Sequence, residues 1–406
     1  MLDLRTLLLM LFCASLINAA ALAPRSTDEW DPRLPVEVWI SSNMPANHHL
    51  AIIKVLDYYS SVTCMNYKAA LNSKSRFEFS NELPPPSVDR PVLDFTYEAH
   101  GGCNSTLGKS QRTSIRLDES CGTFGAVARE VAHTLGLIYT PERPDRDEHI
   151  TVSASTAIKK FTEKGRAAVS TYGVPYDFGS VMHYSPDSSK TRSSSAFVVK
   201  DALKKYSLGD NARPTASDLF LINKRLGCGD CEKSSLNECK NGGVNSYNDC
   251  VSGGWMLVAP DRLMAGSFMC RIRAMWGSAW RGESPCGGKT LKATYLWQEV
   301  SGEIATSSAD RPHCHWRITA DPFVKVRIKL IRAGPCQKED QLSCENGGIE
   351  LKTRDFGARG YKFCCQSQID GILDHEFVTE SSMAQISLAV RNGTSSFRIA
   401  YKQWWF

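Results

Sequence analysis

Residues 129–147 read REVAHTLGLIYTPERPDRD. With the preceding GTFGAVA, this stretch carries an apolar residue every three or four positions, which predicts a helix that ends near Gly136. The apolar face of this helix is formed by Phe124, Val127, Val131 and Leu135. Arg129, Glu130 and His133 project close to one another, because positions i and i+4 lie one helical turn apart.

The spacing of these residues is the one that zinc peptidases use. Two histidines at i and i+4 bind the metal, and a glutamate between them is the general base for the metal-bound water. A glycine three residues after the second histidine permits a sharp turn, so that a third ligand at Tyr139 can fold back to the ion. Here the three ligand positions hold Arg129, His133 and Tyr139, and Glu130 stands at the position of the base.

The whole stretch resembles the signature of the astacin family of secreted zinc metalloproteases, H-E-x-x-H-x-x-G-x-x-H-E-x-x-R-x-D-R. The agreement extends past the helix to Arg143, Asp145 and Arg146. Downstream, residues 176–184 (YDFGSVMHY) are similar to the family's Met-turn. The resemblance covers residues 30–228, which we expect to form the peptidase domain.

Within this resemblance, Met182 would lie beneath the metal, and Tyr184 would be the tyrosine that binds or releases zinc. Glu130 and Tyr184 would be the catalytic residues of an active member, and zinc would be its cofactor. The resemblance also implies the disulfides Cys64–Cys228 and Cys103–Cys121.

The differences from the family signature fall on the residues that carry the chemistry. Arg129 stays protonated and has no lone pair for zinc. Tyr139 could bind zinc only as a phenolate, and the ordinary pKa of its side chain is ~10. His133 is the only remaining histidine, whereas a catalytic zinc site needs three protein ligands and a water. Thr140 replaces the glutamate that engages the mature N-terminus in the family.

These differences predict impaired or lost zinc binding and proteolysis, with no tightly bound metal. The alternative is an active zinc metalloendopeptidase that hydrolyses extracellular proteins. Glu130 and His133 then have a structural interpretation, in which they satisfy each other or Arg129. Arg129 either supplies the charge of the missing ion or reaches into solvent. We interpret Arg143, Asp145 and Asp147 as a salt-bridge and turn cluster.

Length and composition indicate two or three domains of an ordinary globular protein, because the chain has 406 residues, 42% of them hydrophobic and 22% charged. The formal charge of +5 argues against nucleic acid as the main partner. Residues 1–21 have the pattern of a secretory signal peptide, and residues 22–29 are left for a short pro-segment or linker. No later run approaches ~18 apolar residues, so we expect no membrane span and a secreted, extracellular protein.

Cysteine usage fits an exported chain. Of fifteen cysteines, Cys13 lies in the predicted signal peptide, and the even remainder indicates a disulfide framework. We expect two bridges among cysteines 231, 239, 250 and 270, and two among cysteines 336, 344, 364 and 365. Asn104 and Asn392 begin N-glycosylation sequons.

Residues 229–285 resemble a degenerate EGF-like module and linker, with four cysteines where that family uses six. An irregular disulfide-clasped linker remains open as an alternative. Residues 286–403 resemble a CUB domain, a secreted β-sandwich that recognises proteins. The motifs that carry this resemblance are Cys286-Gly287-Gly288, CHWRI at 314–318, FRIAY at 397–401 and, for the variant attached to nematode astacins, residues 348–365. It implies the disulfide Cys286–Cys314.

VKVRIKLIR (Val324–Arg332) predicts a strand with alternating apolar and basic faces. The basic face of this strand either binds an acidic partner or is simply solvated. The terminal Trp404-Trp405-Phe406 either binds a partner or packs against the sandwich. The expected fold is therefore α+β: a two-lobed astacin-type (metzincin) protease domain, a small disulfide-rich EGF-like module and a β-sandwich CUB domain. The expected partner is an extracellular protein or matrix component bound by the cleft or the CUB domain. A purely structural matrix role is a further alternative.

Overall fold

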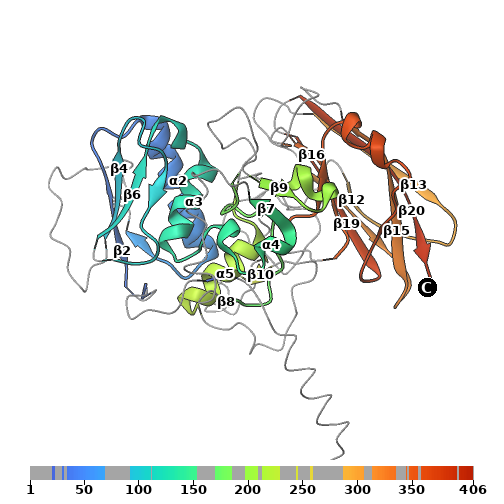
Figure 1. Ribbon diagram of the computed structural model, residues 1–406, viewed down its shortest axis with the longest axis horizontal. Helices are drawn as coiled ribbons and strands as arrows, with labels where there is room; N and C mark the ends of the chain where they lie inside the picture. Colours follow the sequence, from blue (N-terminus) through green and yellow to red (C-terminus); the bar gives the residue numbers. More distant parts are fainter. Residues whose placement is uncertain are drawn as a thin grey trace, which may run out of the picture.

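The computed structural model contains an N-terminal α/β part within residues 30–228 and a C-terminal β-sandwich within residues 287–405 (Figure 1). It describes residues 21–22, 30–31, 34–68, 92–110, 112–152, 170–184, 197–208, 213–228, 244–245, 257–258, 287–305, 313–334, 344, 347–354, 358–390 and 393–405. Most of the predicted signal peptide, linker and EGF-like module lies outside these residues, as do Cys286 and Asn392.

The N-terminal part begins with a five-stranded sheet of order β3-β2-β4-β6-β5, in which only the β5–β6 pairing is antiparallel. Its strands are β2 (Val36–Ile40), β3 (Tyr67–Lys68), β4 (Val92–Tyr97), β5 (Asn104–Ser105) and β6 (Arg112–Leu117). Two helices, α2 (Ala46–Val62) and α3 (Phe124–Thr134), pack with this sheet into one apolar core (Figure 1).

Helix α3 forms where the apolar periodicity predicts it. The Thr123 side chain caps its first turn by accepting a hydrogen bond from the Ala126 amide (3.2 Å). Val127 and Val131 are fully buried in the core, and Leu135 follows them at the C-cap. Because packing fixes this face of α3, the residues on its opposite face, including Arg129, have defined positions.

The sharp turn predicted after α3 is confirmed. Gly136 has a φ of +92°, which is accessible to glycine but strained for other residues. An added Cβ there would also lie 2.5 Å from Arg225 Nε. The chain then runs back, and the Thr140 amide donates to the Met182 carbonyl (3.1 Å), which joins the turn to the Met-turn segment (residues 176–184).

The rest of the N-terminal part has little sheet. Its short elements are η1 (Glu119–Cys121), η2 (Thr140–Glu142), α4 (Arg146–His149), β7 (Ile150–Val152), β8 (Ser170–Thr171), β9 (Phe197–Val199) and η6 (Ala202–Ser207). Helix α5 (Ala216–Leu226) closes it, begins with a capping box between Thr215 and Asp218, and ends at Gly227 in the left-handed conformation. None of the helices in the described residues is long and apolar enough to cross a membrane.

Two disulfides hold the N-terminal part, and both are the pairings that the family resemblance implies. Cys64–Cys228 joins the end of α2 to the end of α5 across 164 residues, and Cys103–Cys121 joins the loop before β5 to η1. Short antiparallel pairs occur elsewhere, between β1 (Ala21–Leu22) and β8, and between β10 (Val244–Asn245) and β11 (Leu257–Val258).

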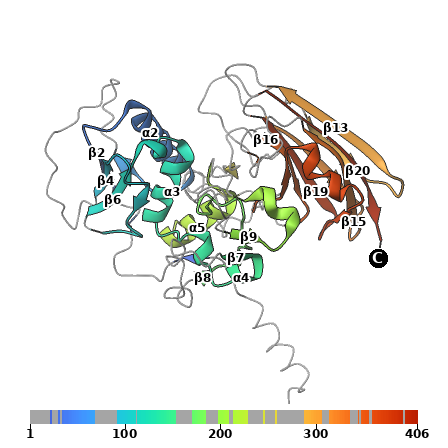
Figure 2. The same cartoon turned by 45° about the horizontal axis from the view of Figure 1, so that its top comes forward.

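The C-terminal part is a sandwich of two sheets, of order β12-β14-β19-β16-β17 and β13-β20-β15-β18 (Figure 2). The strands are β12 (Gly287–Lys292), β13 (Gln298–Ala305), β14 (His313–Thr319), β15 (Lys325–Gly334), β16 (Gly347–Lys352), β17 (Tyr361–Phe363), β18 (Phe377–Val378), β19 (Met383–Val390) and β20 (Thr394–Trp404), with η8 (Gln366–Gln368) and η9 (Asp370–Ile372) before β18. The alternation predicted for β15 is confirmed, because Val326, Ile328 and Leu330 enter the core between the sheets.

A disulfide joins Cys344 to Cys364, which is one of the pairings allowed by the expectation for that group of cysteines. Cys314 and Cys365 are also disulfide-bonded.

The sandwich is docked on the N-terminal part through residues 358–363. The Arg359 amide donates to Asp177 Oδ1 (3.0 Å), and the Ser207 hydroxyl donates to the Gly360 carbonyl (2.8 Å). Lys204 Nζ lies 4.1 Å from the centroid of the Tyr361 ring. Both ribbon views show η6 beside the sheet that contains β16 (Figures 1 and 2). The Met-turn segment, which contains Asp177, is therefore in direct contact with the sandwich.

A buried carboxylate fixes the docking segment from within the sandwich. Glu350 accepts a hydrogen bond from the Gly360 amide (2.7 Å) and lies 3.2 Å from Arg359 Nη1. Burial alone would raise the pKa of Glu350, but the Arg359 and Lys352 cations lower it to about 2. Glu350 is therefore ionised at neutral pH, and it holds Arg359 and the segment beside it in place.

We predict that Gly179→Ala disrupts this docking. A Cβ at Gly179 would lie 2.5 Å from Arg359 Cβ, where the backbone on both sides is held by Asp177. Overpacking of this kind lowers the free energy of unfolding by about 1–3 kcal/mol. Chemical denaturation measures the loss, and Gly371→Ala is the matched control, because a Cβ there meets no atom within 4 Å. Equal stability of both variants would show that the contact does not exist in solution.

Candidate functional site

Arg129 extends from α3 to the Met-turn segment. Its Nε donates to the Val181 carbonyl (3.1 Å), and its guanidinium carbon lies 5.2 Å from the centroid of the Tyr184 ring. A guanidinium at that distance from a tyrosine ring makes a cation–π contact. The side chain is only partly buried, so it neither projects freely into solvent nor enters the core.

Glu130 and His133 are joined through a third residue, Ser105 of β5. The Ser105 hydroxyl donates to Glu130 Oε2 (2.7 Å), and its oxygen lies 3.3 Å from His133 Nδ1. Burial raises the pKa of Glu130, although the Ser105 hydrogen bond and the Arg129 charge act against this. The interpretation in which Glu130 and His133 satisfy each other directly is therefore corrected: β5 supplies the hydroxyl between them.

Three aromatic side chains, those of His133, Tyr139 and Tyr184, pack against one another beside Arg129. The rings of His133 and Tyr139 are stacked, with centroids 4.6 Å apart and planes at 24°, and the Tyr139 ring lies 5.2 Å from that of Tyr184. Burial lowers the pKa of His133 to about 4 and raises that of Tyr184 to about 12. Burial also raises the pKa of Tyr139 far above its ordinary value. At neutral pH His133 is uncharged, and both tyrosines are phenols.

The Met-turn segment is held by the buried carboxylate of Asp218 from α5. Asp218 accepts hydrogen bonds from the Ser180 hydroxyl (2.6 Å) and the Val181 amide (2.9 Å). Burial and the nearby Asp177 charge raise the pKa of Asp218 to about 6. The carbonyl that receives Arg129 belongs to Val181, so Asp218 also sets the position of the Arg129 side chain.

His183 is buried behind the site. Its Nδ1 lies 3.0 Å from the Tyr184 carbonyl and therefore carries the proton, so its Nε2 accepts from the Tyr176 hydroxyl (2.8 Å). Burial lowers the pKa of His183 to about 4. Both nitrogens are used in hydrogen bonds, so His183 does not replace a missing metal ligand.

The salt-bridge cluster predicted after the helix is present, with different partners for its two carboxylates. Arg143 makes a bidentate pair with Asp145 (2.8 and 2.6 Å), whereas Asp147 pairs with Arg146 (3.0 Å). The Arg143 guanidinium also donates to the Val174 carbonyl (3.0 Å). The cluster ties the segment after the turn to the strand-poor half of the N-terminal part.

A small cavity of about 20 Å³ lies on the other side of the Met-turn segment. Thr140, Arg143, Asp177 and Asp218 contribute to its wall, whereas Arg129, His133 and Tyr184 do not. Its volume is close to that of one water molecule. It is therefore too small to hold a substrate side chain.

The residues at the site do not fit a catalytic zinc ion. One imidazole, one guanidinium and two protonated phenols offer a single good ligand, while such a site needs three. Among the described residues, the only group of three potential ligands is Cys103, Asp118 and Cys121, and its two cysteines form a disulfide.

The structure brings together Arg129, Glu130, His133, Tyr139 and Tyr184, which the sequence pattern placed at one site. It adds Ser105, the residue after Asn104 in the predicted glycosylation sequon, which was not expected at the site. The first residue of that sequon, Asn104, is partly exposed, and its side chain accepts a hydrogen bond from Arg116 Nε (3.2 Å).

Comparison with known proteins identifies a family model and several relatives that match this chain. The model of the peptidase family described as Astacin matches residues 23–227. The zinc metalloproteinase nas-27 of Caenorhabditis elegans is 27% identical over 91% of this chain and 84% of its own length. The zinc metalloproteinase nas-36 of Brugia malayi is 29% identical over 84% of this chain and 55% of its own length.

Two solved structures were matched as well. High choriolytic enzyme 1, a hatching enzyme zinc-protease from Oryzias latipes, is 19% identical with a TM-score of 0.41, over 51% of this chain and all of that one. The CUB1-EGF-CUB2 domain of human MASP-1/3 is 15% identical with a TM-score of 0.20, over 29% of this chain and 42% of that one.

We predict that the protein loses stability between pH 6.5 and pH 4. His133 and His183 have folded-state pKa values near 4, so in this range only the unfolded chain binds their protons. Each imidazole then lowers the free energy of unfolding by up to about 3 kcal/mol. Asp218 acts in the opposite direction with a similar magnitude, because its folded-state pKa is raised to about 6.

Urea denaturation of the wild type and of His183→Gln at several pH values measures this contribution. The variant should show a shallower fall in stability toward pH 4, whatever its stability at pH 7. Parallel pH profiles for the two proteins would contradict the assignment of His183 as a buried neutral imidazole.

Proposed function

Because the chain belongs to the astacin family, we propose that it is a secreted member that has lost zinc binding and proteolysis and acts by binding extracellular proteins. The observation that carries the proposal is the placement of Arg129, whose side chain extends from α3 and whose guanidinium contacts the Val181 carbonyl and the Tyr184 ring. A permanent cation at a ligand position repels a divalent ion and offers it no lone pair. The predicted signal peptide and the disulfides support export.

The remaining side chains support the same conclusion. Tyr139 covers His133, and burial keeps its hydroxyl protonated. Water becomes a usable nucleophile near neutral pH only when a bound ion lowers its pKa from 15.7 to ~7. Glu130, engaged with Ser105, does not have this effect by itself. The site therefore keeps the family's spacing of residues 129, 133 and 139 without the group that drives hydrolysis.

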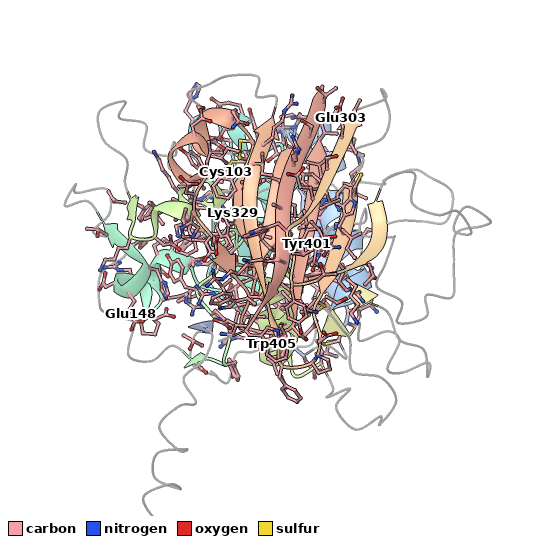
Figure 3. All side chains as sticks on the ribbon, turned by 90° about the vertical axis from the view of Figure 1, so that its right-hand side faces the viewer. Cys103, Glu148, Glu303, Lys329, Tyr401 and Trp405 are labelled. Atoms are coloured by element: carbon pink, nitrogen blue, oxygen red, sulfur yellow. A yellow bond between two sulfur atoms is a disulfide. The ribbon has the colours of Figure 1, made fainter. Side chains whose placement is uncertain are left out.

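The C-terminal sandwich, which we propose to be a CUB domain, offers a second binding surface on its β13-β20-β15-β18 sheet. Lys329 and Lys402 lie 5.5 and 4.7 Å from the centroid of the Trp297 ring, and the Tyr295 and Trp405 rings are stacked 6.2 Å apart. In Figure 3 Trp405 lies at the end of the sandwich opposite Glu303. Exposed aromatic rings beside cations are typical of protein-binding surfaces.

We predict that Trp405 contributes little to stability, as a binding residue should. Its side chain is 52% exposed, so Trp405→Ser should change the free energy of unfolding by no more than about 0.5 kcal/mol. The comparison is Trp316→Ala, which empties a buried position against Phe397 and should cost about 3–5 kcal/mol. A large loss for Trp405→Ser, measured by thermal or chemical unfolding, would favour packing as its role.

We predict that the purified protein retains no zinc through dialysis and cleaves peptides only at background. The double change Arg129→His with Tyr139→His should restore retention of about one zinc per chain, because it supplies three imidazoles. Either single change should help little, because the ligand set stays incomplete. Metal analysis by mass spectrometry and hydrolysis of a general peptide substrate are the measurements.

The decisive control is Glu130→Ala in the wild-type background. Stoichiometric zinc in the wild type, with peptide cleavage that Glu130→Ala abolishes, would show that the protein is an active endopeptidase. Recovery of metal in the double variant alone would show that the site lost its ligands and kept its geometry.

A further inference from the structure

The guanidinium of Arg129 has hydrogen-bonding capacity that the protein does not use. Arginine carries five N–H donors, and within the described part of the chain only Nε of Arg129 has a hydrogen-bond partner, the Val181 carbonyl. Among the described residues, Arg129 forms no ion pair, and its two Nη nitrogens donate to no protein oxygen. A partly buried guanidinium in this condition is ready to accept an anion.

The neighbouring carboxylate does not take this role. Glu130 follows Arg129 in the chain, but its Oε2 is held by Ser105, and the two residues form no salt bridge within 4 Å. Glu130 is buried, whereas Arg129 remains partly exposed and lies across the face of Tyr184. The Glu130 carboxylate therefore lies against Ser105, whereas the Arg129 guanidinium lies beside Tyr184 and remains available to a ligand.

The guanidinium is also held in position before any ligand arrives. The Val181 carbonyl accepts from Nε. The backbone on both sides of this carbonyl is held, because the Val181 amide donates to Asp218 and the Met182 carbonyl accepts from the Thr140 amide. The Tyr184 ring supports the guanidinium from one side. A side chain already ordered loses little conformational entropy on binding, so more of the ion-pair energy is available for affinity.

We propose that Arg129 binds a carboxylate of a peptide, through two parallel hydrogen bonds from its Nη nitrogens. This inference rests on the proposed function, since it names the ligand class of the same non-catalytic site. The planar fork of an arginine matches the two oxygens of a carboxylate, which a lysine does not reproduce. The carboxylate comes either from a chain terminus or from an acidic side chain, and the experiment separates these sources.

The test uses the full-length protein and three fluorescein-labelled pools of hexapeptides of matched composition. One pool has a free C-terminal carboxylate and no acidic residue, the second is the same pool amidated, and the third is amidated with one internal glutamate. Fluorescence anisotropy should show at least about tenfold tighter binding of the first or third pool than of the second, as expected for a charge-assisted pair. Which of the two binds identifies the source of the carboxylate.

Two variants test the role of the fork. Arg129→Met should remove the preference for carboxylate-bearing pools, and Arg129→Lys should restore only part of it. Arg398→Met, which removes one exposed arginine from the sandwich, is the matched control and should leave the preference unchanged. Thermal unfolding of each variant establishes that it is folded.

Three outcomes would overturn the carboxylate site: equal binding of all pools, no binding of any pool, or an unchanged preference in Arg129→Met. Such a failure leaves the proposed loss of proteolysis intact, because these three outcomes concern peptide binding and not peptide cleavage. Cleavage of the pools by zinc-containing wild type is a separate observation, and it would overturn the proposed function itself.

Discussion

The bridge from Arg129 to the Met-turn segment is the interaction on which the site depends. In a zinc protease, the ion joins the helix to the turn that follows it, and a structural zinc site can contribute about 10–16 kcal/mol. Here the link consists of one hydrogen bond from a charged donor, worth about 1.5–3 kcal/mol, and a cation–π contact of about 0.5–2 kcal/mol. The stacked His133 and Tyr139 rings add about 0.5–1.5 kcal/mol. This sum is well below the contribution of a metal, so the two halves of the N-terminal part need other connections.

Those connections lie in the same structure. The Cys64–Cys228 disulfide closes a loop of 164 residues, for which chain entropy gives up to about 5 kcal/mol. Asp218 holds the Met-turn segment from α5, and Asp177 in that segment accepts from both Gly179 and Arg359. The sandwich therefore supports the segment that positions Val181, which in turn holds Arg129. The segment that receives Arg129 is therefore ordered in part by a contact between residues 182 apart in the chain.

The parts of this arrangement that were predictable from sequence are the local ones. The apolar period fixed the extent of α3, glycine at 136 predicted the turn, and alternation predicted β15, because each pattern reports burial along one element. The residue types at 129 and 139 also predict an incomplete ligand set, which stays a prediction. The role of Ser105 was not predictable, because β5 has only two residues, and a hydrogen bond between residues 25 apart in the chain follows no local pattern. The docking of residues 358–363 was missed for the same reason, since no periodicity marks a contact between distant loops.

The survival of Glu130 and His133 beside Arg129 has a physical explanation that needs no catalysis. Glu130 is almost fully buried, and a buried carboxyl without a partner costs about 1–3 kcal/mol or more. Ser105 supplies that partner and also lies against His133, while Tyr139 covers the other face of the imidazole. The three polar groups therefore form one small buried network, in which replacing any member leaves another unsatisfied. A glutamate and a histidine at protease spacing thus persist as packing and hydrogen-bonding residues, and their presence is no evidence for a metal between them.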